Sequence, residues 1–164
     1  MAGTGGTPDE ALIGIEPDGS LWPYLKDKNI HMCKTFRMLA KKTGRENAQY
    51  SYSMNAFLGE REHSGENCYQ GVVKEGEVKR PASIFFFSEE NTWTIEGLSR
   101  YVINDNNLLI GSMEARDCFA TYHNPPAGDI DKGSGNLVFV DGHVGSVTAD
   151  QQRNGGNFKL AWPR

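Results

Sequence analysis

The sequence lacks a long hydrophobic run. Residues 84–87, Ile-Phe-Phe-Phe, form an apolar stretch of only four residues, whereas a helix that spans a bilayer needs about 20. The first residues also lack the basic and apolar regions of a secretory signal peptide. We expect residues 1–18, which are rich in glycine, proline and aspartate, to be a flexible leader or a remnant of expression, and residues 19–164 to form one domain.

Positive charge and paired cysteines are scarce as well. Lys and Arg number 17 against 21 Asp and Glu, a net charge of −4, and this balance argues against nucleic-acid binding. The three cysteines, Cys33, Cys68 and Cys118, form no CxxC pair, which argues against a zinc ribbon. One disulfide with a free thiol, or three buried thiols, both remain open.

Catalytic motifs are missing too. The chain has no nucleophile elbow, phosphate-binding loop or HExxH motif. Glu89 and Glu90 are adjacent carboxylates at the end of an apolar strand, but neighbours in a strand point to opposite faces. They therefore cannot act together as a glycosidase pair, and we predict that the protein is not an enzyme.

The composition favours a loop-rich α+β domain with short strands, because glycine is frequent (19 residues) and hydrophobic residues make up 38%. The patterning predicts helices over residues 20–25 and 35–43 and a helical turn at 148–152 capped by Thr148. A long loop is expected over residues 59–76. The predicted strands are 50–57, 81–90, 101–103, 108–110, 118–122 and 158–162, the second of them buried on both faces at 84–87.

The strongest local signal lies at residues 133–147. Asp141-Gly142 between two apolar runs predicts a β-hairpin with a tight turn. We interpret Asn136, Asp141, Gly142 and His143 as a structural turn set. Asp141 would tolerate positive φ and bond its own backbone, and His143 would point inward and bond backbone carbonyls or Asn136.

Two metal sites are conceivable from the residue types. Asp129, Asp131, Gly133 and Gly135 alternate in a glycine-rich loop, and such a loop can wrap around Ca²⁺; a plain Asp-rich turn is the alternative. Glu89, His123, Asp141 and His143 would suit Zn²⁺ or another transition metal if they converge at one end of the sheet. Structural hydrogen bonding explains the same four residues without a metal.

Several motifs occur in the order known from one bacterial family. The segment Asn136-Leu-Val-Phe-Val-Asp-Gly-His-Val144 resembles the C-terminal signature of the prepilin-type, processing-associated pseudopilins, which are related to the major pseudopilin of type II secretion. Ser51-Tyr-Ser-Met-Asn55 resembles the family's SYxxN strand, and residues 19–33 and 81–89 resemble two further segments. The chain departs from the pattern in the longer separation of His123 from Asp141 and in Lys34, which replaces the usual proline after the cysteine.

The resemblance implies a pilin-like head with a short antiparallel sheet and long loops, whose N-terminal hydrophobic helix is truncated. It also implies a non-enzymatic structural subunit of a type II secretion or type IV pilus-like assembly, with other pseudopilin subunits, homo- or hetero-assembled, as partners. The expected location is the periplasm or cell surface, with membrane contact only through the missing helix. Calcium in the C-terminal loop, at Asp129 and Asp131, is the cofactor that the resemblance favours.

A second function, from a different class, stays open at this point. It is a small secreted metal-dependent enzyme or carbohydrate-binding domain that uses His123, Asp141 and His143, with Glu89 beside them, around a divalent ion.

Overall fold

The protein has a mixed α+β fold built on a five-stranded sheet. The computed structural model describes residues 32–43, 51–59, 62–63, 69–99, 107–110, 117–154 and 157–163, together with Tyr24, Asp27 and Ile30. The helices are α3 (Lys34–Thr43), α4 (Ala149–Arg153) and α5 (Asn157–Ala161). The strands of the main sheet are β1 (Tyr52–Asn55), β4 (Phe85–Glu89), β5 (Asn107–Leu108), β6 (Ser134–Phe139) and β7 (Val144–Thr148).

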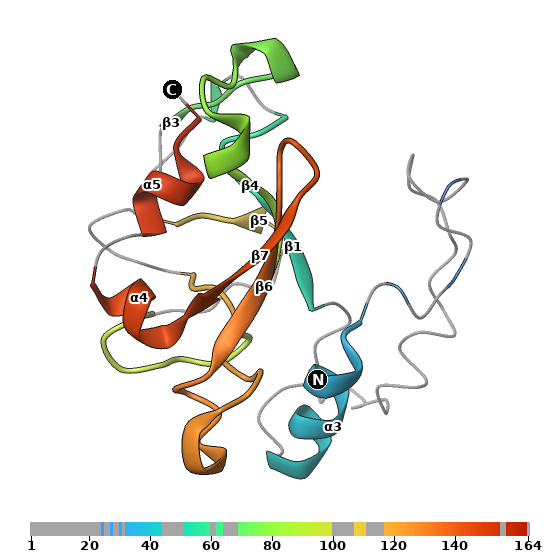
Figure 1. The fold of residues 1–164 in the computed structure, drawn as a ribbon, viewed down its shortest axis with the longest axis vertical. Coiled ribbons are helices and arrows are strands. Elements are labelled where there is room, and N and C mark those ends of the chain that lie inside the picture. Colours follow the sequence, from blue (N-terminus) through green and yellow to red (C-terminus); the bar gives the residue numbers. More distant parts are fainter. Residues whose placement is uncertain are drawn as a thin grey trace, which may run out of the picture.

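The sheet has the strand order β5-β1-β4-β6-β7. β1, β4, β6 and β7 pair antiparallel, as expected, but β5 runs parallel to β1, so the sheet as a whole is mixed. Helices α4 and α5 lie to the left of the β6–β7 hairpin in Figure 1, and α3 lies at the lower right, near the start of β1. Within the described residues, no helix is long and apolar enough to cross a membrane.

Local signals predicted several elements correctly. The helix expected at 35–43 is α3, and Thr148 caps α4 through a reciprocal capping box with Gln151. In that box the Gln151 N–H donates to Thr148 Oγ1 and the Thr148 N–H donates to Gln151 Oε1. The strand predictions at 50–57 and 81–90 are confirmed by the shorter strands β1 and β4.

Other predictions of secondary structure are wrong, at segments that make contacts with distant parts of the chain. The strand expected at 158–162 is the helix α5, whose end is bound by the Asn55 side chain: Asn55 Nδ2 donates to the carbonyl of Ala161 at 2.9 Å. The segment expected to be a loop at 59–76 contains the strands β2 (Glu62–His63) and β3 (Tyr69–Gln70) and the 3₁₀ turn η2 (Glu75–Glu77). The leader 1–18 and the strand expected at 101–103 lie outside the described residues, as does nearly all of the helix expected at 20–25.

β4 is not buried on both faces as predicted. Ile84 and Phe85 are fully buried, but Phe86 is 39% exposed. The cause is an irregularity in the register between Phe85 and Phe87, where β4 bulges against β6. At the bulge, the side chains of β4 no longer point alternately to the two faces of the sheet.

The hairpin is present, with a longer turn than predicted. The Phe139 N–H donates to His143 O, and the Gly142 N–H donates to Phe139 O, both at 2.9 Å, so three residues, 140–142, form the loop. Gly142 has φ +89, whereas Asp141 is not among the described residues with positive φ. The left-handed position therefore belongs to glycine, as in three-residue hairpin loops.

A short extended segment, residues 119–123, separates β4 from β6 at one end of the sheet; we call it the inserted segment. The β4–β6 ladder ends at the pair Ser88–Leu137. Beyond it the Ala120 N–H donates to Glu89 O at 2.9 Å, and His123 forms an antiparallel bridge with Ser134. Gly133 and Gly135 permit this approach, since a Cβ on Gly133 would lie 2.3 Å from Thr121 O. The glycine spacing thus serves close backbone packing.

The turn yields a stability prediction. Gly142→Ala is expected to destabilise the fold by about 1–2 kcal/mol, because a Cβ is unfavourable at positive φ. Gly76→Ala is the matched control: neither position has an atom within 4 Å of an added Cβ, and only Gly142 has positive φ. Urea unfolding of both variants measures the difference. Equal midpoints would show that the turn does not require glycine.

Candidate functional site

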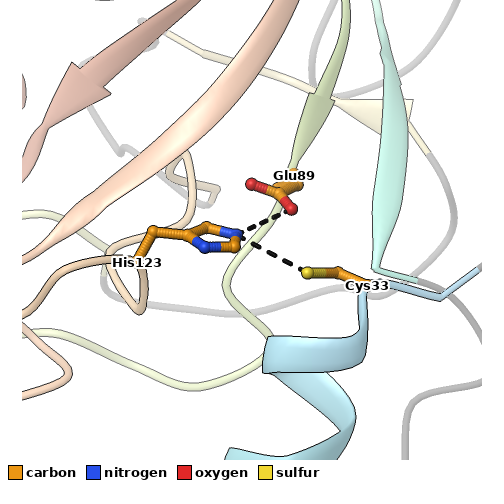
Figure 2. A group of neighbouring side chains, drawn as sticks. All are labelled: Cys33, Glu89 and His123. Carbon is orange, nitrogen blue, oxygen red and sulfur yellow. Dashed lines mark hydrogen bonds and ion pairs between the residues drawn. The ribbon is translucent and has the colours of Figure 1, made fainter.

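Three side chains that can bind a metal converge beside the inserted segment: Cys33, Glu89 and His123 (Figure 2). His123 Nε2 lies 2.8 Å from Glu89 Oε1 and 3.5 Å from Cys33 Sγ. The three ligand atoms all lie within 4.8 Å of one another. Among the described residues, this is the one group of three or more His, Cys, Asp or Glu side chains so close together.

Glu89 is held at the point where β4 and β6 separate. Its Oε2 accepts the Asn136 N–H at 2.9 Å, and Ser88 Oγ, which donates to Glu89 O at 2.8 Å, lies 3.3 Å from Asn136 O. The Glu89 side chain thus pairs the Asn136 N–H that a continuing ladder would pair. The Glu89 side chain is only 2% exposed, and its second oxygen is directed to His123 (Figure 2).

His123 is fixed through its backbone. Its N–H donates to Ser134 O at 3.0 Å, and its carbonyl accepts the Ser134 N–H at 2.9 Å. A Cβ on Gly133 would come within 2.3 Å of His123 O, so the two segments are in close contact. The imidazole is therefore positioned by a rigid part of the sheet, with its side chain 19% exposed.

Cys33 reaches the cluster because the apolar face of α3 is buried. Phe36, one turn further on, packs against Trp93 and Tyr122 with ring centroids 6.4 and 5.5 Å apart. Burying such a ring stabilises the contact by about 1.5–3 kcal/mol. The Cys33 N–H donates to Ser51 Oγ at 2.7 Å, which fixes the residue just before the helix.

The surroundings of the cluster disfavour negative charge. Burial raises the pKa of the Cys33 thiol, against an opposing effect of the Phe36 N–H, and Glu89 raises it further. Burial also raises the pKa of Tyr52 to about 12, with Cys33 and Glu89 adding to the effect. Tyr122 responds in the same way, its pKa raised first by burial and then by the charge of Glu89. An anion beside Glu89 is therefore costly unless a cation accompanies it.

The arrangement differs from a cysteine–histidine catalytic pair with an orienting acid. In that arrangement the acid binds one imidazole nitrogen and the thiol faces the other. Here Glu89 and Cys33 both approach Nε2. Glu90, the neighbouring carboxylate, has a separate partner, the hydroxyl of Ser53. The two glutamates thus do not share a site, as strand alternation leads one to expect.

The second predicted metal set is not brought together. Glu89 and His123 are in contact, but Asp141 and His143 lie at the hairpin turn, near the other end of β6, where the Val140 N–H donates to Ile84 O. His143 does not point inward: its Nδ1 lies 2.6 Å from Asp141 Oδ1, and its ring stacks on Phe139 at 4.2 Å. Asn136 lies within β6, away from the turn.

The residues of the expected calcium loop have protein partners. Asp129 Oδ2 lies 3.0 Å from Lys132 Nζ, and the indole N–H of Trp93 donates to Asp131 Oδ1 at 2.7 Å. Gly133 and Gly135 face the inserted segment, as described above. Calcium binding by these four residues stays a prediction.

Cys33 is the site residue that sequence reasoning missed. It lies 90 residues before His123 and belongs to no spaced ligand motif. The signal that could have indicated it is its place just ahead of an amphipathic helix, whose buried face points the preceding residue toward the sheet.

The hairpin pair gives a prediction for pH. The hydrogen bond from His143 lowers the pKa of Asp141, so this contact is present above the usual carboxyl range and is lost as pH falls through the lower folded pKa. NMR titration of the Asp141 carboxyl should show a midpoint below that of an unpaired Asp. His143→Ala should raise the midpoint, and Val144→Ala should leave it unchanged. An identical midpoint in wild type and His143→Ala would disprove the pairing.

A comparison of the chain with models of protein families, with curated proteins and with solved structures finds no match.

Proposed function

We propose that the protein is a non-enzymatic structural subunit, the head domain of a pilin-like assembly, in which copies of the chain contact one another through the β7 side of the sheet. The observation that carries the proposal is the edge strand β7. It is the last strand in the sheet order, and its residues, Val-Gly-Ser-Val-Thr, include no charge and no proline. In monomeric proteins, charged residues or prolines usually protect edge strands against pairing with another chain.

An apolar row leads to this edge. Phe87 pairs with Val138 and Val138 pairs with Val144, so the three side chains follow one another across β4, β6 and β7. Val138 is 37% exposed and Val144 69% exposed. Apolar side chains next to an edge strand that contains neither charge nor proline are suited to contact with another protein surface.

The occupant we propose is a second copy of the chain. The resemblance of residues 136–144 to the pseudopilin signature supports this choice, and a subunit that repeats in a filament must present two different surfaces to its neighbours. The polar groups of the turn fit a structural role as well, since Asp141 and His143 bind each other and the Asp141 side chain also accepts the His143 N–H. In this proposal the head lies in the periplasm or at the cell surface, anchored through a hydrophobic helix that the resemblance implies.

Site-specific photo-crosslinking in the native cell tests the proposal. A photoreactive residue at position 144 should give an adduct that contains two copies of the chain, joined to a peptide outside β7, as head-to-tail contact requires. Position 38 is the matched control, because Met38 on α3 is comparably exposed, at 64%, and lies away from the edge. Adducts at 144 no stronger than at 38, or an adduct to an unrelated protein, would refute contact between copies through the β7 side. A β7–β7 adduct would indicate a two-fold dimer and contradict a filament.

A further inference from the structure

We propose that Cys33 Sγ, Glu89 Oε1 and His123 Nε2 bind a zinc ion that fastens α3 to the sheet. The proposal does not depend on assembly of the heads, because all three residues belong to one copy of the chain. It starts from the convergence of two side chains on a single imidazole nitrogen, shown by the dashed lines in Figure 2.

One nitrogen cannot serve both contacts as hydrogen bonds of good geometry. An imidazole nitrogen carries either one proton or one lone pair, directed along one axis in the ring plane. Glu89 Oε1 at 2.8 Å and Cys33 Sγ at 3.5 Å compete for that direction. A cation on the lone pair of Nε2 satisfies the nitrogen, the carboxylate and the thiolate together.

The separation of sulfur from nitrogen fits a tetrahedral ion. Zinc–sulfur and zinc–nitrogen bonds of about 2.3 and 2.0–2.1 Å at a tetrahedral angle place sulfur about 3.6 Å from nitrogen. The observed separation is 3.5 Å. The nitrogen–oxygen pair, now at hydrogen-bond distance of 2.8 Å, needs to lengthen by about 0.5 Å. We expect a rotation of the Glu89 carboxylate to supply that shift.

The donor set favours a transition-metal ion such as zinc over calcium and magnesium. A thiolate, an imidazole and a carboxylate are the ligands of zinc, whereas calcium and magnesium prefer oxygen alone. The thiolate of Cys33 and the carboxylate of Glu89 would balance the charge of Zn²⁺, so the bound ion and these two ligands would carry no net charge. Three protein ligands leave the fourth position to solvent, as in open zinc sites.

The outer contacts of the ligands are in place. Glu89 Oε2 is held by the Asn136 N–H, and His123 is fixed by its two backbone bonds to Ser134. Such contacts orient metal ligands and raise affinity.

Zinc binding to the full chain is the test. We expect one zinc per chain after addition of zinc sulfate and removal of excess, and a competition assay with a chelating dye should show that Cys33→Ala weakens binding more than about 100-fold. Even changes outside the direct ligands cost about 10–100-fold. Cys118→Ala is the matched control, since Cys118 is a free, buried cysteine outside the cluster. Glu89→Gln and Glu90→Gln form a second pair, of which only the first should lose affinity.

X-ray absorption of the zinc-loaded wild type identifies the zinc ligands directly, so the proposal can still be tested if a variant fails to fold. The spectrum should show one sulfur at about 2.3 Å among nitrogen or oxygen neighbours. Less than one zinc, no sulfur, two sulfurs, or equal losses in Cys33→Ala and Cys118→Ala would each overturn the assignment. A melting temperature raised by calcium and not by zinc would overturn it as well, and would direct attention to Asp129 and Asp131.

Discussion

The buried carboxylate of Glu89 is the interaction on which the arrangement of this domain depends. A carboxylate with 2% side-chain exposure is stable only if each oxygen has a partner. One oxygen takes the Asn136 N–H at the end of the β4–β6 ladder, and the other faces His123. The first contact closes the gap where the strands separate. The second fixes the inserted segment against both strands, and through Tyr122 and Phe36 that segment carries the helix α3.

Gly133 and Gly135 are needed for close backbone packing, and their spacing in the sequence does not reveal this role. Gly133 and Gly135 alternate with polar residues, a pattern that also fits a cation-binding loop. The structure uses both where the backbone of residues 120–123 comes too close for a side chain. Had either been alanine, the inserted segment would have to move away, and His123 with it. The same two residues therefore determine how near the imidazole can lie to Glu89.

Local features of the fold were predictable, and features that need distant partners were not. The Asp-Gly turn, the Thr148 cap and the helix α3 follow from contacts within a few residues. A strand was predicted for α5 because Phe158, Leu160 and Trp162 alternate in the sequence; in the structure the end of the helix is bound by Asn55, 106 residues away. Of the candidate site, Glu89 and His123 were predicted but were grouped with Asp141 and His143, since residue types alone do not tell which end of β6 each one meets. Cys33 was missed because no spacing rule links it to a histidine 90 residues later.

The proposed zinc site and the proposed assembly are connected by the way the domain would bear a mechanical load. The cluster lies near the start of β6, whereas Val144, on the strand proposed for contact between heads, lies beside the hairpin turn at the other end, so the two proposals concern different ends of one strand pair. If the head is anchored through the chain that precedes α3, a pull on the anchor would act on Met32 and Cys33, the described residues that lead into α3. Without zinc, the aromatic packing of Phe36 would resist that pull, and such side-chain contacts can separate under load. Bonds from zinc to Cys33, Glu89 and His123 would instead join the helix, β4 and the inserted segment at a single atom, and the head would transmit the load without losing α3.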